Sequence, residues 1–229
     1  ISKSKTTYVV FGASGDLAKR YLLPALENIN HVDNIVHISR KDYQNISKLI
    51  PIEGEKIFHL AIPPQGVPEA VEIIHKNFGT ENIKILLEKP FGRDLESAKA
   101  LIKHIDNFFS ENQIYRVDHY LAKTSLQKIV KQEWSKENIT SIEILASEKI
   151  DIEGRVNFYE QTGALKDFVQ SHLLEMTALV LSNSLEAPRR CEALSNLGVV
   201  CDITQRECVK RGQYVGYRDE VNNSESVTE

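Results

Sequence analysis

Gly12-Ala13-Ser14-Gly15-Asp16-Leu17-Ala18 is the stretch that decides the fold of the N-terminal half of this chain. It follows Thr6–Phe11, an apolar run rich in strand-forming residues, and precedes Asp16–Asn28, where leucines recur at helical spacing. A glycine turn between a strand and a helix lets the backbone approach a pyrophosphate, whose negative charge the helix dipole favours. The pattern is Gly-x-x-Gly-x-x-Ala, which meets the usual three-glycine fingerprint only in part. An ordinary strand-to-helix turn is therefore the alternative.

Strands and helices alternate after this turn. Further strands are expected at 34–39, 57–62, 83–87 and 114–117, and helices at 67–78 and 94–109. Such alternation implies a mostly parallel sheet with helices on both faces, joined by right-handed crossovers. We therefore expect an α/β fold, with a doubly wound parallel Rossmann sheet over residues 1–118. An incomplete α+β substrate domain over residues 119–229 is expected to follow.

The second half has a different pattern. Residues 139–147 alternate between apolar and polar and predict a strand with one exposed face. Residues 163–181 predict a long helix, and a shorter helix is expected from Ala187 to Leu197. The polar tail from Asn222 is expected to be loose.

Composition excludes several classes of protein. The 229 residues carry a net charge of -4, whereas a nucleic-acid-binding protein needs a clustered basic surface. No apolar run approaches the roughly 20 residues of a membrane span, and no apolar segment of secretory type precedes the first strand. The three cysteines are too few and too irregular for a disulfide framework or a zinc site. We expect a cytoplasmic protein with reduced thiols, no metal, no nucleic-acid partner and no membrane association.

The end of the second expected strand bears on the choice of coenzyme. An NAD-binding domain usually places Asp or Glu here, whereas this chain has Ser39-Arg40-Lys41. A carboxylate would repel a ribose 2′-phosphate, and a guanidinium can bind it with two hydrogen bonds. Arg40 and Lys41 therefore favour NADP, and a solvated basic turn is the alternative.

Several motifs recur in the order of one known family. They are residues 12–20 (GASGDLAKR), 88–95 (EKPFGRDL), 116–123 (RVDHYLAK), 163–172 (GALKDFVQSH) and 211–214 (RGQY). In these motifs the chain resembles the glucose-6-phosphate dehydrogenase family, as a short or C-terminally truncated member. The resemblance implies an NADP-dependent oxidoreductase that moves a hydride from C1 of a hexose 6-phosphate to the coenzyme and forms the lactone. It places the coenzyme on the following residues: Gly12, Ser14, Gly15, Asp16, Leu17, Arg40, Lys41 and Lys89.

The resemblance also implies the catalytic residues. His172 matches the general base, and a histidine that is neutral near pH 7 suits the removal of a hydroxyl proton. Asp118 matches the carboxylate that orients this imidazole. Lys89 matches a lysine that contacts both sugar and coenzyme, in a Lys89-Pro90 peptide that is often cis in the family.

Five further residues match the substrate site of the family. His119, Tyr120 and Lys123 match the group that binds the sugar phosphate, and each can donate a hydrogen bond to a phosphate oxygen. Glu148 and Asp167 match carboxylates that accept hydrogen bonds from sugar hydroxyls. A solvated surface charge is the alternative for Glu148.

The chain also departs from the family pattern. Tyr21 stands where the family commonly has a substrate-binding lysine, and Ser171 stands where it usually has Asn. The segment between Arg40 and Ile57 is short and is expected to lack a helix, which would leave the adenine side of the coenzyme pocket more open. The large C-terminal sheet that carries the dimer interface of the family is not present, so a homo-oligomer is possible but would lack its usual interface.

Two alternative functions stay open from the sequence. One is a sugar dehydrogenase of the Gfo/Idh/MocA type, which shares the Rossmann domain and the Glu-Lys-Pro strand end. The other is a catalytically weak NADP-binding regulatory module, which the short substrate domain and Tyr21 would suit.

Overall fold

The computed structural model of this chain describes residues 5–132, 136–147, 151–152, 156–201, 208–210 and 212–221. The chain divides into two compact units, Ile1–Asp118 and His119–Glu229. Each unit is described by itself. Glu148 and the polar tail from Asn222 lie outside the described residues.

The N-terminal unit is built on one parallel sheet of five strands in the order β2-β1-β3-β4-β5. The strands are β1 (Thr6–Phe11), β2 (Asn34–Ile38), β3 (Glu55–Leu60), β4 (Ile83–Leu87) and β5 (Ile114–Arg116). The chain leaves β1 toward β2 on one side and later returns to β3 on the other side. This reversal of strand order creates the crevice in which doubly wound sheets bind their ligands. The predicted α/β class with a doubly wound sheet is confirmed.

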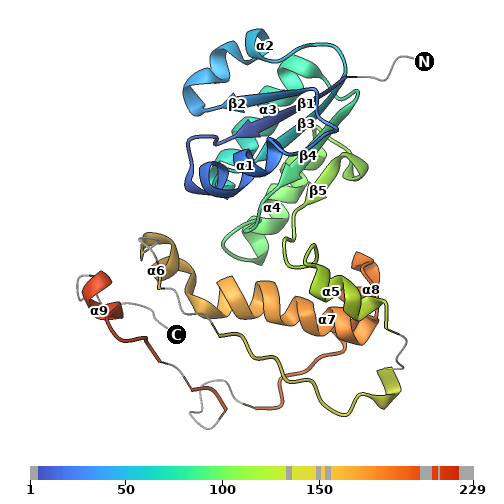
Figure 1. Cartoon of the computed structure of the whole chain (residues 1–229), viewed down its shortest axis with the longest axis vertical. Helices are drawn as coiled ribbons and strands as arrows, with labels where there is room; N and C mark the ends of the chain where they lie inside the picture. Colours follow the sequence, from blue (N-terminus) through green and yellow to red (C-terminus); the bar gives the residue numbers. More distant parts are fainter. Residues whose placement is uncertain are drawn as a thin grey trace. The chain divides into compact units, whose positions relative to one another are not determined.

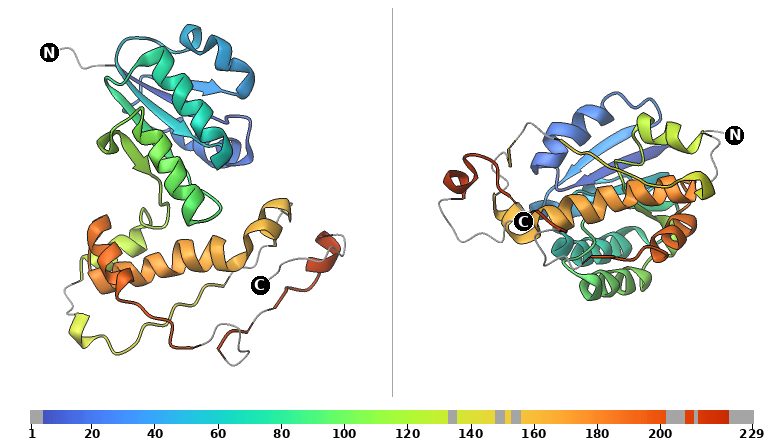
Figure 2. Two further views of the ribbon diagram at one scale, coloured as in Figure 1. Left: turned by 180° about the vertical axis from the view of Figure 1, so that it is seen from behind. Right: turned by 90° about the horizontal axis from the view of Figure 1, so that it is seen from below.

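Helices cover both faces of this sheet (Figures 1 and 2). They are η1 (Ala18–Leu22), α1 (Leu23–Leu26), η2 (Arg40–Asn45), α2 (Ile46–Leu49), η3 (Pro64–Gly66), α3 (Val67–Phe78), α4 (Leu95–Asp106) and η4 (Glu111–Gln113). The larger core lies on the face of α3 and α4 and includes Phe11, Phe58 and Ile85, all fully buried. A smaller core forms on the α1 face around Val10. Alternate residues of each strand serve the two cores because successive side chains point to opposite faces.

Two details of this unit differ from the expectation. The helix after the glycine turn begins at Asp16, where it was expected, but its segment Ala18–Leu22 is π-helical. The segment after β2 does contain helix, η2 and α2, so the prediction that it lacks one was wrong. A capping box explains the difference, because Ser39 and Asp42 satisfy each other's backbone and side-chain groups at the start of η2.

Helices are the regular secondary structure of the C-terminal unit within the part that the structure describes. Its helices are α5 (Thr124–Val130), η5 (Lys136–Asn138), α6 (Val156–Ala164), η6 (Leu165–Leu173), α7 (Leu174–Ser182), α8 (Ala187–Ser195) and α9 (Tyr217–Glu220). The segments α6, η6 and α7 follow one another without a break, with a kink at Gly163, whose φ is 68° (Figure 1). The long helix expected at 163–181 is therefore the larger part of a helical run over 156–182.

The strand expected at 139–147 is not formed. These residues are extended, but none of them is paired in a sheet with another described residue. Apolar alternation predicts which face a strand would bury, whereas the strand itself exists only through hydrogen bonds to a neighbour. Leu145 in this segment is 88% exposed, so no described side chain covers it.

The cysteines also correct the prediction. Cys201 and Cys208 are joined as a disulfide, whereas reduced thiols were expected, and Cys191 is free and exposed. The two Cα atoms lie 6.0 Å apart, within the usual span of a disulfide. A sequence does not reveal such proximity when only three cysteines are present.

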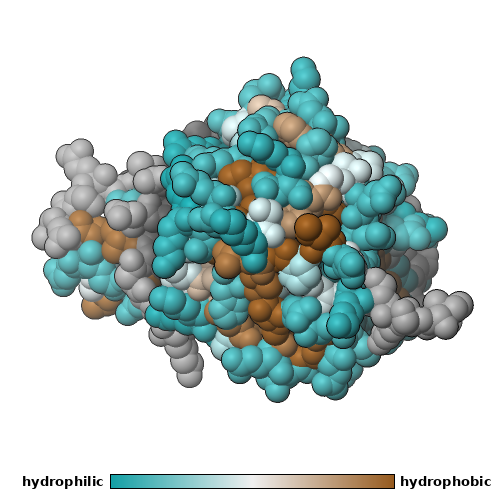
Figure 3. Space-filling view, turned by 90° about the horizontal axis from the view of Figure 1, so that it is seen from above, coloured by the Kyte–Doolittle hydropathy of each residue, from teal (hydrophilic) through white to brown (hydrophobic). Residues whose placement is uncertain are grey.

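None of the helices in the described part of the chain combines the length and the apolar character needed to cross a bilayer. The view in Figure 3 shows hydrophobic residues that reach the surface in patches among hydrophilic ones. Within the described residues, no cluster of three His, Cys, Asp or Glu side chains could hold a metal ion.

Candidate functional site

The glycine turn lies at the carboxyl end of β1, beside the reversal of strand order. Its backbone is fixed by hydrogen bonds from Gly12 N to Ile38 O (2.9 Å) and from Gly15 N to Gly12 O (2.8 Å). Gly12 has φ +76°, and a Cβ atom there would lie 2.3 Å from Ala61 O. Only glycine fits this position, because both the dihedral angle and the space exclude a side chain. The turn therefore fits the close backbone approach that a pyrophosphate requires.

The side chains that follow this turn are open to solvent. Ser14, Asp16 and Leu17 are all exposed. The Asp16 carboxylate forms an ion pair with Arg20 across one helical turn, at 2.7 Å. Tyr21, which replaces the usual lysine of the family, is 63% exposed.

Two cationic side chains and one hydrogen-bonded carboxylate lie at the end of β2. Arg40 and Lys41 are exposed, and the Arg40 guanidinium donates to Glu69 at 3.0 Å. Asp42 accepts hydrogen bonds from the Ser39 hydroxyl (2.5 Å) and backbone N–H (2.8 Å), and these bonds lower the pKa of its carboxyl. The Asp42 carboxylate is thus part of the N-terminal cap of η2. Sequence reasoning did not identify Glu69, which lies on α3.

The loop after β4 borders a pocket in the N-terminal unit. Lys89 is half-buried, and the Lys89-Pro90 peptide is cis. This loop and the loop after β3 line one part of a pocket of about 380 Å³, and helices α3 and α4 line the rest. The lining residues are Phe91, Gly92, Arg93, Pro64, Gln65, Pro68, Ser97, Ala100, Leu101 and His104. The two loops leave the sheet at the carboxyl ends of β4 and β3, the edge where ligands of doubly wound sheets bind.

The C-terminal unit gathers four of the predicted residues into one cluster. The Tyr120 ring stacks on the His172 imidazole with centroids 3.8 Å apart, and His119 approaches the same imidazole at 5.0 Å. The Lys123 ammonium lies over the Tyr120 ring, 3.5 Å from its centroid, a favourable cation–π contact. His172 itself is buried at 5% exposure in η6.

A turn, not a helix, brings the first three of these residues together. Residues 119–123 precede α5, and Lys123 N donates to Tyr120 O at 2.9 Å. Phe168 completes the cluster with its ring 5.5 Å from His172. Sequence reasoning did not single out Phe168, although its position one helical turn before His172 places both on one helix face.

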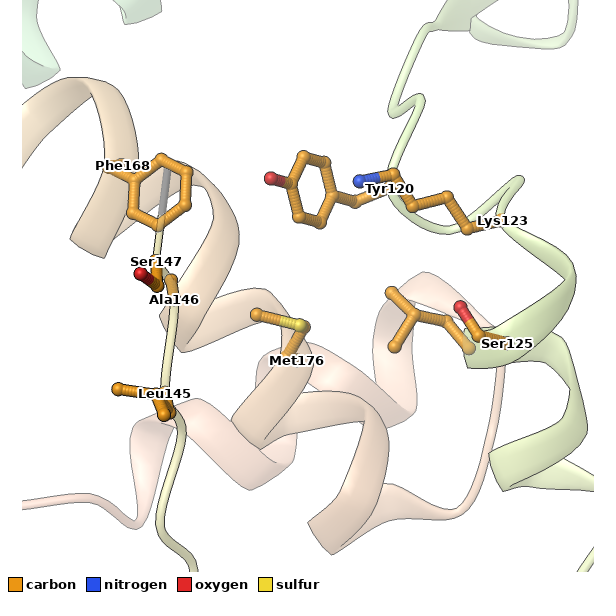
Figure 4. A pocket seen from close by; sticks show the side chains of 9 residues that line it. Tyr120, Lys123, Ser125, Leu145, Ala146, Ser147, Phe168 and Met176 are labelled. Atoms are coloured by element: carbon orange, nitrogen blue, oxygen red, sulfur yellow. The ribbon is translucent and has the colours of Figure 1, made fainter. Parts of the chain in front are cut away.

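A pocket of about 270 Å³ opens beside this cluster (Figure 4). Its lining combines the hydroxyl and ammonium groups of Tyr120 and Lys123 with the apolar side chains of Leu126, Phe168 and Met176. Pockets for small molecules are mostly apolar with a few placed polar groups, and this one is near the lower end of their usual size. Among the residues that line this pocket, Lys123 extends toward the Tyr120 ring (Figure 4).

Comparison with known families covers residues 38–229. Residues 38–128 match the family model described as glucose-6-phosphate dehydrogenase, NAD binding domain. Residues 125–229 match the model described as glucose-6-phosphate dehydrogenase, C-terminal domain. The chain belongs to the glucose-6-phosphate dehydrogenase family. The model that matches residues 38–128 describes an NAD binding domain, which fits a coenzyme of the nicotinamide dinucleotide class. The family match favours this family over the Gfo/Idh/MocA alternative.

Individual relatives agree with the family. The chain is 35% identical over 203 residues to glucose-6-phosphate 1-dehydrogenase of Helicobacter pylori strain J99, which covers 82% of this chain and 47% of the relative. It is 35% identical over 185 residues to glucose-6-phosphate 1-dehydrogenase 6, cytoplasmic, of Arabidopsis thaliana, covering 73% of this chain and 36% of the relative. The chain thus spans about half the length, or less, of these curated relatives.

A solved glucose-6-phosphate dehydrogenase has the same fold. The crystal structure of glucose-6-phosphate 1-dehydrogenase from Mycobacterium avium superposes with a TM-score of 0.72 at 25% identity. The match covers 99% of this chain and 63% of that one. A second structure, of a glucose-6-phosphate dehydrogenase in complex with glucose-6-phosphate, matches with a TM-score of 0.66 at 23% identity and supports the fold alone.

Apart from Lys89, the residues predicted for catalysis and substrate binding fall into three groups. His119, Tyr120, Lys123 and His172 lie together in one unit. Asp167, on the same helical segment as His172, is half-buried, and its backbone carbonyl accepts a hydrogen bond from the Ser171 hydroxyl. Asp118 ends the N-terminal unit and His172 belongs to the other unit, so the pairing of these two residues stays a prediction. The role of Glu148 also stays a prediction, because this residue lies outside the described residues.

Proposed function

We propose that this chain carries the coenzyme site and the central part of the substrate site of an NADP-dependent dehydrogenase for glucose 6-phosphate or a close hexose 6-phosphate. The packing of His119 and Tyr120 against the His172 imidazole, with Lys123 over the Tyr120 ring, is the observation that carries this proposal. It joins a group that can accept a proton to groups that can bind a phosphate, beside a pocket of suitable size.

In the proposed reaction the sugar C1 hydroxyl loses a proton and C1 loses a hydride, which leaves the lactone. The His172 imidazole accepts the proton, because a neutral histidine near pH 7 has a pKa suited to this transfer. Asp118 is assigned the role of orienting the imidazole and stabilising its charged form. NADP, when bound, supplies the nicotinamide ring that accepts the hydride.

Substrate binding is assigned to the cluster around Tyr120. Lys123 and His119 would donate charge-assisted hydrogen bonds to the phosphate, and Tyr120 would donate through its hydroxyl. Asp167 and Glu148 would accept hydrogen bonds from the sugar hydroxyls. Lys89 would contact both the sugar and the coenzyme.

The preference for NADP over NAD rests on the end of β2. Arg40 is 84% exposed in its side chain and can reach a 2′-phosphate, and Lys41 adds a second exposed cation. The nearby Asp42 carboxylate is directed into hydrogen bonds with Ser39. Gly12, Ser14, Gly15, Asp16 and Leu17 are assigned to the pyrophosphate side.

A coupled pair of measurements tests the proposal. NADP and glucose 6-phosphate are added and the absorbance of the reduced coenzyme is followed, with calorimetric titration of each ligand in parallel. We expect turnover that falls by about 10²–10⁴-fold in His172→Ala, the range for loss of a general base. The exposed His31→Ala variant is the control and should be unaffected.

The titrations separate the alternatives. Undiminished turnover in His172→Ala would reject the role of this imidazole. Binding of NADP without any binding of glucose 6-phosphate would instead favour the coenzyme-binding regulatory module.

A further inference from the structure

A chain of three hydrogen-bonded side chains crosses the centre of the N-terminal sheet. The Tyr8 hydroxyl lies 2.8 Å from His59 Nδ1, and His59 Nε2 lies 2.7 Å from the Glu88 carboxylate. The side chains of His59 and Glu88 are only 5% and 14% exposed. Tyr8 belongs to β1 and His59 to β3, and Glu88 follows β4 directly. The hydrogen-bonded side chains therefore link the three central strands.

Every polar atom of the imidazole is used in this arrangement. An ionised Glu88 accepts the Nε2–H bond, and the Tyr8 hydroxyl donates to Nδ1, which is the tautomer that the network favours. Burial, and secondarily the charge of Glu88, raise the pKa of Tyr8 to about 12, which keeps its hydroxyl protonated as a donor. A buried network with all its groups satisfied is rigid, whereas loss of one member leaves a costly unpaired group.

Strand register places all three side chains on one face. His59 is the register partner of Val10 and of Leu86, and these partners belong to the face opposite the larger core. Tyr8 is two residues before Val10, and Glu88 is two residues after Leu86, so all three share that face. Glu88 is therefore held at its position by contacts that reach back across the sheet.

The anchored residue directly precedes the loop at the ligand-binding edge. Glu88 is followed by Lys89, and residues 91–93 line the pocket of about 380 Å³ together with the loop after β3, α3 and α4. The hydrogen bond between His59 and Glu88 thus joins the ends of the two strands from which both pocket loops leave. Because neighbouring residues of an extended chain face opposite ways, holding Glu88 on one face directs Lys89 away from it.

We propose that Tyr8, His59 and Glu88 are positioning residues that fix the direction of Lys89 at the carboxyl edge of the sheet. The inference rests on the function proposed above, in which Lys89 contacts coenzyme and sugar. None of the three touches ligand in this scheme. Their effect is to hold the flexible side chain of Lys89 close to the position that productive binding needs. A misplacement of about 1 Å can reduce turnover by roughly 10²-fold.

The test compares Glu88→Ala with Glu88→Gln. The glutamine oxygen can accept the same hydrogen bond from His59, whereas alanine cannot. We expect Glu88→Ala to lower kcat/KM by on the order of 10–100-fold and to weaken coenzyme binding in calorimetry. Glu88→Gln should restore most of both, and Tyr8→Phe, which removes a single hydroxyl, should fall between them.

A matched control lies on the same two strands. Glu55 of β3 and Lys84 of β4 form an ion pair at 2.5 Å, but at the amino end of the sheet. Glu55→Gln should change thermal stability without changing coenzyme affinity. Equal effects of Glu55→Gln and Glu88→Ala on coenzyme affinity would overturn the proposal, because they would reflect a general loss of stability.

A readout without any ligand separates this inference from the proposed function. The rate at which an amine-reactive ester labels each lysine is measured by mass spectrometry in the wild type, Glu88→Ala and Glu55→Gln. We expect the rate at Lys89 to change in Glu88→Ala alone. An unchanged rate at Lys89 would overturn the positioning role even if the enzyme turns over. A changed rate in a protein that binds no coenzyme would support that role while the proposed function fails.

Discussion

The ring of Tyr120 lies flat against the imidazole of His172, with centroids 3.8 Å apart and planes inclined by 23°. Tyr120 belongs to the turn before α5, and His172 to η6, so the contact joins two elements that are distant in the chain. Together with Phe168 it encloses the imidazole and limits its rotation. A general base gains from such restriction, because proton transfer requires a fixed direction of approach.

We predict that Tyr120→Ala changes the environment of His172 before any ligand is added. The stacked aromatic ring shields the imidazole protons, so their NMR resonances should move downfield in Tyr120→Ala and remain near the wild-type position in Tyr120→Phe. The aromatic pair should also contribute about 0.5–1.5 kcal/mol to unfolding free energy. Unchanged imidazole resonances in Tyr120→Ala would show that the rings do not stack in solution.

A second prediction concerns the glycine turn. Gly12 and Gly79 both have positive φ, +76° and +70°, but only Gly12 is crowded, since its Cβ would lie 2.3 Å from Ala61 O. Gly79→Ala should cost roughly 1–3 kcal/mol for the dihedral angles alone, because φ 70° with ψ -142° lies in a region that is essentially restricted to glycine. Gly12→Ala should cost a further ~1–3 kcal/mol, because the backbone must shift. Urea unfolding of both variants measures this difference, and equal losses would mean that the turn adapts freely.

Most of the sheet could be predicted from the sequence because its strands are short apolar runs bounded by glycine, proline or charge. Thr6–Phe11 and Ile83–Leu87 were predicted with the bounds that the structure has, as was the helix Val67–Phe78. These elements depend on local periodicity and on nearby turn residues. The expected strand at 139–147 failed for the opposite reason, because a strand depends on a partner that periodicity does not reveal.

The candidate site could be predicted only in part. Residues such as His172 and Lys123 stand in motifs, and their chemistry identifies them within those motifs. Glu69 and the hydrogen-bonded network through His59 act through contacts between distant segments, which no local pattern encodes. A histidine inside an otherwise apolar strand was a visible signal for His59, since such a group needs a partner when buried.

A third prediction concerns the choice of coenzyme. Glu69 pairs with Arg40 and, in the function proposed above, would compete with a 2′-phosphate for the guanidinium. Glu69→Gln should therefore tighten NADP binding, but only by up to about five-fold, because exposed ion pairs contribute roughly 0–1 kcal/mol. Affinity for NAD should stay the same.

Calorimetry with each coenzyme measures both changes. Glu96→Gln is the control, because Glu96 forms an exposed ion pair with Lys99 on α4, at 3.2 Å. An equal gain in affinity for NAD and NADP in Glu69→Gln would indicate a general charge effect and would count against the role of Arg40.

The last prediction uses the pKa of Tyr8, which burial and the Glu88 carboxylate raise from 10.0 to about 12. The folded state holds this proton more tightly than the unfolded state, so the contribution to stability is full below pH 10. It is lost as the pH rises from 10 toward 12. After allowance for solvent screening of a half-buried group, the loss should be about 1–2 kcal/mol. The free energy of unfolding in urea, measured from pH 8 to pH 11.5 for the wild type and Tyr8→Phe, should converge over this range. The exposed Tyr21→Phe variant should stay parallel to the wild type, and parallel curves for Tyr8→Phe would contradict a buried hydroxyl bound to His59.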